Sequence, residues 1–573
     1  MLVELGIAAA GVAAIWPKAA AHLALSRAKH PSLAGHARMS RWLAARLPRY
    51  DFGAETFFES DGAPGDVAAT RRTGFLRLSA ELRARSPRTI EATEALAEGV
   101  SDLQFTRAYR VPFPYARYLA GHLAVGGLVA RSRGVHVTDL DGNDAIDLTG
   151  SYGVNLFGYD FYTACIEAGA AHVRDLGPVL GAYHPIIQEN VDRLRRISGL
   201  DEVSFHMSGT EAVMQAVRLA RYHTGRSHLV RFCGAYHGWW DDVQPGVGTP
   251  KAVGGVYTLR EMHERSLHVL RTRGDIACVL VNPLQALHPN APAPGDSSLV
   301  DGGRRAGFDR EAYTTWLRQV RDVCTARGIV LILDEVFLGF RLAPGGAQEF
   351  FGVKADLVTY GKTLGGGLPV GVVCGTRALM RRFREQRPAD ICFARGTFNS
   401  HPYVMGAMLE FLRRLDTPAL RQTYDGLEAT WNRRADALNR RLAEHDLPVR
   451  VANLVSVWTV CYTVPSRYNW MFQFYLRAEG LALSWVGSGR FIFSHTFTDA
   501  DCDDVAERVV RAAHRMLADG WWWHPPAASN ASVQRAVLRE IVEARLGRRG
   551  RHRAGPVTIG SKRSPRNTES GAL

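Results

Sequence analysis

The chain has 573 residues, enough to bury a large core and to form two or more domains. With 46% hydrophobic and 22% charged residues, it has the composition of a soluble globular protein. The formal net charge is +14, but residues 545–573 hold eight Lys/Arg and one acid, so half of the charge lies in this tail. The remainder is only mildly basic, which argues against a nucleic-acid-binding surface.

Cysteine and histidine usage gives no sign of a metal site. The eight cysteines are scattered, with no C-x-x-C pair and no histidine cluster at metal-ligand spacing, so we expect no zinc site. Several, such as Cys278 and Cys374, lie inside apolar runs, where cysteine is usually a small core residue. This usage suits a reducing compartment, and we predict a cytoplasmic protein.

The first 105 residues are predicted to form a helical extension without a catalytic motif. Leu5–Trp16 is apolar but short for a membrane span, and Pro17 and Lys18 close it. We therefore expect a packed or interfacial helix, with weak contact to a membrane surface as the alternative. Further helices are predicted over Lys18–Leu25, Met39–Leu47 and Gly74–Arg85. The extension is expected to pack on the body of the protein or on a second subunit.

A hairpin and a glycine-rich loop follow the extension. Asp141 and Gly142 are a turn signal between two short predicted strands. The loop over residues 150–153 contains Ser151 and Tyr152. By residue type alone, these two are compatible with an ordinary turn residue and a core residue.

The next motif has the form of an anion site. A short strand over Val203–His206 leads into a tight turn of Ser208, Gly209 and Thr210, after which apolar residues repeat at helical spacing. Such a turn offers backbone N–H groups, two hydroxyls and the positive end of a helix dipole to one point, which suits a phosphate. An ordinary N-cap made by Ser208 or Thr210 is compatible with this interpretation.

Two further predicted strands end in polar or aromatic residues. His228–Phe232 is followed by Tyr236 and His237, and an aromatic residue in such a place is usually a packing residue. Ile276–Val281 ends in Asn282. The following segment, 288–308, is rich in Pro, Gly, Asp and Ser and is predicted to be an inserted loop that helps to wall a site.

The central motif pairs an acid and a lysine at two strand ends. Ile329–Leu333 is a short apolar run typical of a strand buried on both faces, and Asp334 and Glu335 follow it. Leu357–Tyr360 is a second such strand, followed by Lys362 and a run of glycines. Ligands bind where parallel strands end, so these side chains are expected to converge. An aspartate that keeps a pyridine nitrogen protonated and a lysine that forms a Schiff base are the machinery of a pyridoxal phosphate (PLP) enzyme.

The C-terminal part is predicted to be a smaller α+β domain. A Gly/Pro-bounded loop contains Thr397 and precedes long helical runs. The predicted elements are helices over Tyr403–Arg414 and Leu427–Ala443 and strands over Val451–Val464 and Phe491–Phe493. Arg490 stands at the start of the last strand, where it is either a surface residue or a ligand for a carboxylate, which a guanidinium fork binds through both oxygens.

Over about residues 110–515, the chain resembles the class III aminotransferases, which include the glutamate-1-semialdehyde aminomutases. Five motifs occur in family order: the hairpin with its glycine-rich loop, S-G-T-E-A, Y-H-G, the Asp-Glu and lysine pair, and a G-T-F motif. The sequence departs from the family pattern at Met207 and His401, each in place of an asparagine, and at Asn282 in place of a glutamate.

The resemblance implies a PLP-dependent transferase fold of type I, in which a mostly parallel sheet is flanked by helices. It also implies roles for residues of this chain. Lys362 and Asp334 are the catalytic pair, Tyr236 stacks on the cofactor ring with His237 beside it, and Ser151, Tyr152 and Arg490 face the substrate. The phosphate is anchored by Ser208, Gly209, Thr210 and, from a neighbouring subunit, Thr397, so the resemblance implies a homodimer with its active site at the subunit interface.

The predicted function is PLP-dependent transfer of an amino group between a small-molecule donor and a keto or aldehyde acceptor. Three alternatives stay open: an intramolecular aminomutase, a non-catalytic scaffold, and an enzyme whose substrate is tethered to a carrier protein. The predicted segments are a helical extension (1–105), the N-terminal segment and large PLP-binding domain (106–405), a small C-terminal domain (406–525), and a helix with a disordered basic tail (526–573).

Overall fold

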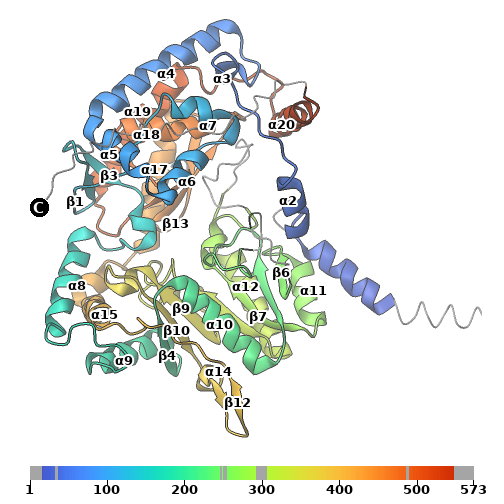
Figure 1. Cartoon of the computed structure of the whole chain (residues 1–573), viewed down its shortest axis with the longest axis vertical. Coiled ribbons are helices and arrows are strands. Elements are labelled where there is room, and N and C mark those ends of the chain that lie inside the picture. Colours follow the sequence, from blue (N-terminus) through green and yellow to red (C-terminus); the bar gives the residue numbers. More distant parts are fainter. Residues whose placement is uncertain are drawn as a thin grey trace, which may run out of the picture.

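The computed structural model describes residues 16–31, 36–244, 248, 254–291, 306–485 and 489–547. The predictions for Leu5–Ile15, for most of the inserted loop and for the basic tail lie outside the described residues. A large sheet with its helices forms one half of the molecule, and the N-terminal helices lie with C-terminal elements in the other half (Figure 1). Within the described part of the chain, every helix is too short or too polar to cross a membrane.

The large half is built on a seven-stranded sheet. Strand β10 runs antiparallel to both of its neighbours, whereas the other adjacent pairs run parallel, which confirms the predicted mostly parallel sheet. In spatial order the strands are β4 (Glu202–His206), β10 (Gly371–Gly375), β9 (Leu357–Gly361), β8 (Val330–Asp334), β7 (Ile276–Val281), β5 (His228–Phe232) and β6 (Val256–Leu259).

The central strands are covered on both faces. Every residue of β7, β8, β9 and β10 is buried, as expected for apolar runs in a parallel sheet between helices. Helix α10 contacts all four strands, and its apolar face forms a core cluster with them. The helices of this half are α8 (Tyr159–His172), α9 (Ile186–Ser198), α10 (Gly209–Thr224), α11 (Glu264–Thr272), α12 (Arg310–Arg327), α13 (Gly346–Phe351), α14 (Arg377–Met380) and α15 (Pro402–Leu415).

The N-terminal extension is helical, as predicted, but one helix is longer than expected. Helix α4 begins at Gly65 rather than at Gly74. Arg71 interrupts the apolar spacing of this stretch, yet its fully buried guanidinium pairs with Asp61 and donates to the carbonyl of Gly520. The helices here are α2 (Ala37–Ala44), α3 (Thr56–Glu59), α4 (Gly65–Arg85), α5 (Pro87–Ala97), α6 (Ser101–Tyr109) and α7 (Phe113–Ala120), preceded by helical residues 16–28.

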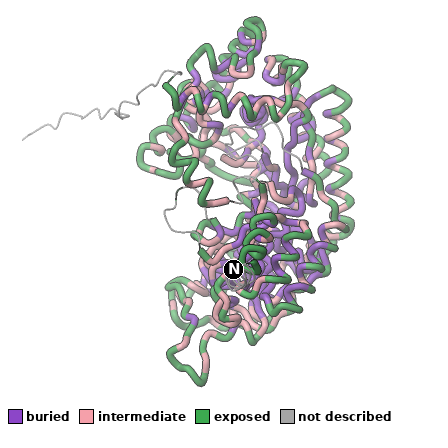
Figure 2. The backbone as a smooth tube through the Cα atoms, turned by 90° about the vertical axis from the view of Figure 1, so that its right-hand side faces the viewer, coloured by how far each residue is buried: buried purple, intermediate pink, exposed green. Residues whose placement is uncertain are grey.

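The C-terminal elements form a small antiparallel sheet and helices around it. The order β13-β14-β16 confirms the predicted strands. The elements are α16 (Pro418–Gln422), α17 (Leu427–Glu444), β13 (Val449–Leu454), β14 (Val457–Tyr462), α18 (Phe472–Ala478), β16 (Arg490–Ile492), α19 (Asp499–Ala518) and α20 (Asn530–Arg545). Helix α18 packs against both α4 and α19, and Figure 2 shows buried residues throughout the interior of both halves.

A small mixed sheet connects the halves. The predicted hairpin is present: β2 (His136–Thr138) and β3 (Asp144–Asp147) pair antiparallel around Gly142, after β1 (Arg131–Arg133). Strand β15 (Leu481–Ala482) then pairs parallel with β3, so the segment after α18 lies beside the glycine-rich loop. A two-stranded hairpin, β11 (Phe383–Arg384) and β12 (Arg387–Ile391), was not predicted; its strands are exposed and short.

Candidate active site

Asp334 and His237 meet at the ends of their strand segments. Asp334 is the last residue of β8, and its Oδ2 lies 2.7 Å from Nδ1 of His237, which follows β5. The other carboxylate oxygen accepts from Thr359 Oγ1 at 3.2 Å and from the backbone N–H of Val336 at 3.1 Å. Both side chains of the pair are buried. Three donors thus orient one carboxylate.

Burial sets the charge of His237. It lowers the pKa of the imidazole, and the opposing attraction of Asp334 does not reverse this direction. We therefore assign a neutral ring whose Nδ1–H donates to the carboxylate. The second ring nitrogen, Nε2, is buried without a hydrogen bond in the described part of the chain.

Lys362 begins a tight turn directly after β9. It has a left-handed backbone with φ of +47°, which a lysine rarely adopts, and it opens the 3₁₀ turn η4 (Lys362–Gly365). Burial lowers the pKa of its amine, against the attraction of Asp334. The amine lies 5.3 Å from the ring centre of Phe337. A lysine held in this way is closer to its nucleophilic neutral form than a solvated one.

The glycine-rich loop lies against this lysine. A Cβ atom on Gly153 would lie 2.7 Å from the Phe337 ring and 3.2 Å from Lys362 Cδ, so only glycine fits. The loop forms the 3₁₀ turn η2 (Gly150–Gly153), in which Ser151 and Tyr152 also have positive φ. The predicted substrate-side residues are therefore adjacent to the predicted catalytic lysine, in a conformation that bulky residues adopt only under tertiary constraint.

Ser151 and Tyr152 differ in their surroundings. The hydroxyl of Ser151 lies 3.1 Å from that of Tyr159, which in turn donates to Asp147 at 2.7 Å. Tyr152 is 53% exposed, which excludes the alternative that it is a core residue.

The N-terminus of α10 lies beside the same strand ends. Ser208 is its N-cap and accepts from the backbone N–H of Glu211 at 3.2 Å, so the ordinary capping role is present. A Cβ atom on Gly209 would lie 2.5 Å from the side chain of Val336, two residues beyond Asp334. A Cβ atom on Gly238, the residue after His237, would lie 2.4 Å from Thr210 Oγ1. The Ser-Gly-Thr turn is thus packed between the segments that carry Asp334 and His237.

Tyr236 and Asn282 occupy the rim. Tyr236 is 59% exposed, and partial burial of its hydroxyl together with the nearby charge of Asp334 raises the pKa of that group. Asn282 is buried and donates to the backbone carbonyl of Tyr236 at 2.8 Å. The residue that departs from the family's glutamate therefore holds the loop of the aromatic residue in place.

Arg490 and Thr397 are less closely connected to this centre. Arg490, the first residue of β16, lies 3.0 Å from Nε2 of His288. Thr397 lies in an exposed turn between β12 and α15, and within the described residues its side chain makes no hydrogen bond. In the part of the chain that the structure describes, no hydrogen bond or ion pair therefore joins Thr397 to Asp334, His237 or Lys362.

Glu335 has a structural place next to Asp334. Its two oxygens accept from the backbone N–H groups of Ala347 at 2.6 Å and of Gln348 at 3.0 Å, in the first turn of α13. Burial raises its pKa to about 7. Sequence reasoning missed this capping role, as it missed Thr359. Thr359 contacts Asp334 because the register of the parallel strands β8 and β9 places the two residues side by side.

The residues present fit PLP. Three different features converge: a buried carboxylate oriented by three donors, a desolvated amine, and a capped helix N-terminus with two hydroxyls at its first turn. They match the pyridine nitrogen, the aldehyde carbon and the phosphate of that cofactor. The exposed ring of Tyr236, close enough to Asp334 for the charge to affect its pKa, stands where a planar group can be stacked.

Comparison with known proteins gives one consistent result. The family model "Aminotransferase class-III" matches residues 120–243 and 305–513. A glutamate-1-semialdehyde 2,1-aminomutase of Desulfatibacillum aliphaticivorans is 30% identical over 408 residues, which cover 68% of this chain and 91% of the relative.

Solved structures agree with this match. An omega-transaminase from Sphaerobacter thermophilus is 26% identical, with a TM-score of 0.55 over 67% of this chain and 90% of that one. A glutamate-1-semialdehyde aminomutase from Pseudomonas aeruginosa PAO1, 18% identical, has a TM-score of 0.61 over 78% of this chain and 99% of that one, and shows likeness of fold. The protein belongs to the class III aminotransferase family of PLP-dependent enzymes.

Proposed function

We propose that this enzyme transfers an amino group from a small-molecule donor to a keto or aldehyde acceptor and that Lys362 and Asp334 are its catalytic residues. The observation that carries the proposal is their placement at the ends of neighbouring parallel strands, with Lys362 desolvated and Asp334 oriented by His237. When bound, PLP supplies an electron sink for the carbanion formed at the substrate Cα.

Each residue of the centre then has a task. Asp334 keeps the pyridine nitrogen protonated, and the neutral His237 orients the carboxylate by donating to it. Lys362 would hold the cofactor until the amino group of the donor takes its place, and the freed lysine amine would then take the proton from the substrate Cα, a step that the lowered pKa favours. Tyr236 covers one face of the ring and excludes water.

The phosphate is held by Ser208, Gly209 and Thr210 at the N-terminus of α10. Thr397 of a second copy of the chain is proposed to complete this site. The exposure of Thr397 and of the neighbouring Phe398, which is 50% exposed, supports an interface at this turn. The enzyme would then be a homodimer whose active sites lie at the subunit interface.

On the substrate side, we propose Ser151, Tyr152 and Arg490. Arg490 is suited to a carboxylate, because its guanidinium binds both oxygens in a fixed geometry. The resemblance to the class III aminotransferases favours transamination here, since aminomutases of the semialdehyde type tend to lack this arginine. The observation in favour of an aminomutase is that the 30% identical relative carries that name. The two functions differ in whether a separate acceptor is needed.

The test is a visible absorbance spectrum of the purified enzyme before and after a panel of amino donors. We expect a yellow protein whose band is lost with a donor and is absent in Lys362→Ala. Recovery of the band only after a keto acid is added would establish transamination. Recovery without an acceptor would establish the aminomutase, and a colourless protein that binds no PLP would leave only the scaffold.

Two further expectations concern surroundings and partners. All eight cysteines are free and seven are buried, which supports a reducing compartment such as the cytoplasm.

A carrier protein as partner would be shown by turnover of carrier-loaded substrate at concentrations where the free substrate is not turned over.

A further inference from the structure

Two arginines from different parts of the chain come together next to the glycine-rich loop. Gln473 of α18 donates to the backbone carbonyl of Arg110 at 3.4 Å, which places the end of α6 on α18. Arg477 is one helical turn beyond Gln473 and therefore lies on the same face. The rings of Phe105 and Trp485 lie 5.7 Å apart between their centres. This second contact joins α6 to the segment that follows α18.

This junction lies beside the substrate-side loop. The backbone N–H groups of Ile146 and Leu148 donate to the carbonyls of Gly480 and Ala482, so the segment after Arg477 runs alongside the strand that leads into the loop. Tyr152 is close enough to affect the pKa of both Arg110 and Arg477. Its neighbour Gly153 lies against Lys362.

The two cations lack a compensating carboxylate. Burial lowers the pKa of Arg110 to about 10 and that of Arg477 to about 9, and for Arg477 the charge of Arg110 adds to the effect. Arg477 donates to the carbonyls of Leu483 and Ser484 at 3.1 and 2.7 Å, while its Nε is buried without a hydrogen bond. Among the described residues, neither guanidinium forms an ion pair.

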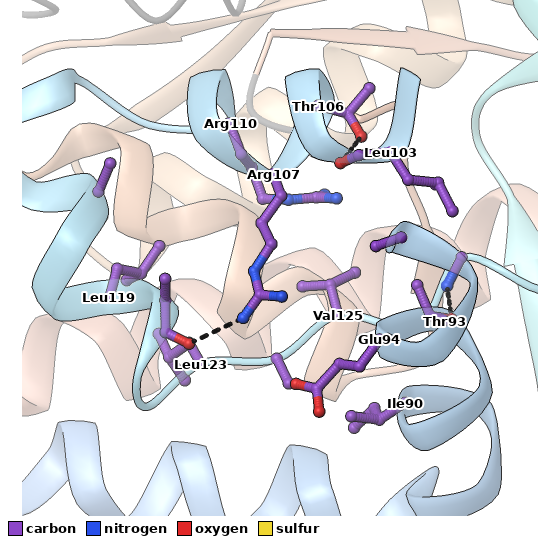
Figure 3. A pocket seen from close by; sticks show the side chains of 15 residues that line it. Ile90, Thr93, Glu94, Leu103, Thr106, Arg107, Arg110, Leu119, Leu123 and Val125 are labelled. Carbon is purple, nitrogen blue, oxygen red and sulfur yellow. Dashed lines mark hydrogen bonds between the residues drawn. The ribbon is translucent and has the colours of Figure 1, made fainter. Parts of the chain in front are cut away.

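Arg110 also borders a cavity within the N-terminal helices, and the other charged groups around this cavity are Arg107 and Glu94. Arg110 lines a mostly apolar cavity of about 70 Å³ between α5, α6 and α7, and Glu94 is the one carboxylate among the described residues that line it. Figure 3 shows Arg107 reaching from α6 across this cavity to the carbonyl of Ala120, to which it donates at 3.5 Å. Glu94 has no ion pair with Arg107 or Arg110 within the part of the chain that is described.

We propose that Arg110 and Arg477 form a subsite for an anionic group, carboxylate or phosphate, at the end of the substrate remote from its reacting amine. The proposal rests on the proposed function, since it assigns a substrate class to the same site. Two like charges held together at a half-buried place are costly unless an anion joins them, and guanidinium groups bind such oxyanions through paired donors.

This subsite differs from the one proposed for Arg490. Arg490 belongs to β16 and contacts His288, whereas Arg110 follows α6 and Arg477 belongs to α18, where Gln473 joins the two elements. An enzyme with both anion subsites would select a substrate that carries two anionic groups, or a substrate whose single anionic group binds away from Arg490. The end of the N-terminal extension would then help to position the subsite, because α6 begins in the extension and ends directly before Arg110.

The experiment uses the holoenzyme and isothermal titration with two probes, inorganic phosphate and glutarate. The holoenzyme is chosen because the bound cofactor already fills its own phosphate site. The variants are Arg110→Met and Arg477→Met, with Arg107→Met as the matched control from the same helix. Arg110→Met is the decisive variant, since Arg477 also supports two backbone carbonyls and its loss can alter folding.

We expect the wild type to bind at least one probe, Arg110→Met and Arg477→Met to weaken that binding at least tenfold, and Arg107→Met to change it less than twofold. Binding of phosphate alone would point to a phosphorylated substrate, and binding of glutarate alone to a carboxylate. The proposal is overturned if the wild type binds neither probe, or if Arg110→Met binds as the wild type does. A yellow holoenzyme that reacts with donors in either case shows that the proposed function stands independently.

Discussion

Nδ1 of His237 lies 2.7 Å from Oδ2 of Asp334, although the two residues are 97 positions apart in the chain. Both side chains are buried, so water does not replace either partner of this hydrogen bond. This relationship fixes the orientation of the carboxylate that we propose as the partner of the pyridine nitrogen. The strand order of the sheet makes this contact possible, because only β7 lies between β5, which precedes His237, and β8, which ends at Asp334.

The first prediction concerns this pair. His237→Phe removes the strongest donor to the Asp334 carboxylate, and we expect kcat to fall by about 10–100-fold, as for the loss of other groups that orient a reacting residue. Stability should fall by about 2 kcal/mol, because the buried carboxylate loses the hydrogen bond that the neutral imidazole donates to it. The measurements are steady-state kinetics and denaturant unfolding of the holoenzyme.

The control is Thr359→Val, which removes only the 3.2 Å hydrogen bond to the other carboxylate oxygen. We expect a smaller loss of kcat for this variant. Full activity in His237→Phe would refute the orienting role of the histidine.

The second prediction concerns the phosphate site. Gly238 has φ of +93°, and a Cβ atom there would lie 2.4 Å from Thr210 Oγ1. Gly238→Ala should therefore displace Thr210 and weaken PLP binding by at least tenfold, measured by titration of the apoenzyme with the cofactor.

Gly142→Ala is the matched control, because Gly142 has a similar φ of +86° but no atom within 4 Å of its Cβ position. It should cost about 1 kcal/mol of stability through backbone strain and leave PLP affinity unchanged. Equal PLP affinity in both variants would mean that Thr210 does not contribute to the site.

The third prediction concerns the dependence of stability on pH. Glu261 is buried, accepts from Tyr313 at 2.7 Å, and has its pKa raised by burial to about 8 from an ordinary value of 4.5. The folded state therefore binds this proton more tightly than the unfolded state. Its contribution to stability is complete below about pH 4.5 and is lost as the pH rises through 8.

Glu261→Gln keeps the side chain neutral at every pH. The fall in melting temperature between pH 6 and pH 9 should be smaller in this variant than in the wild type, as measured by thermal unfolding. The exposed Glu264→Gln serves as control and should keep the wild-type difference. The same difference in all three proteins would show that Glu261 does not titrate in this range.

The fourth prediction concerns the attachment of the C-terminal helix. Arg467 pairs with Glu540 of α20 through two hydrogen bonds of 2.6 and 2.8 Å, and both side chains are buried. Glu540→Ala should lower the free energy of unfolding by about 3–5 kcal/mol, because Arg467 is left buried without its partner. Denaturant unfolding measures this loss.

The double variant Arg467→Met, Glu540→Met removes both charges and should recover most of the lost stability. If the double variant is no more stable than Glu540→Ala, the effect comes from packing of α20 rather than from the charge pair.

Much of the site could be predicted from the sequence because local patterns encode it. Apolar β-branched runs end at Asp334 and just before Lys362, and parallel strands of such runs place their ends at one edge of the sheet. The Ser-Gly-Thr turn before an apolar helical repeat likewise predicts α10 and its capped N-terminus. These signals lie within a few residues of each other and depend little on the rest of the fold.

Sequence alone thus determined the strand ends, the helix cap and the residue types that suit PLP. Only the tertiary structure decided which residues orient them. The contact of His237 with Asp334, the fit of Gly153 against Lys362, and the meeting of Arg110 with Arg477 each join segments from different elements. The physical reason is that burial and neighbouring charge set the pKa and orientation of a side chain, and both depend on segments that are distant in the chain.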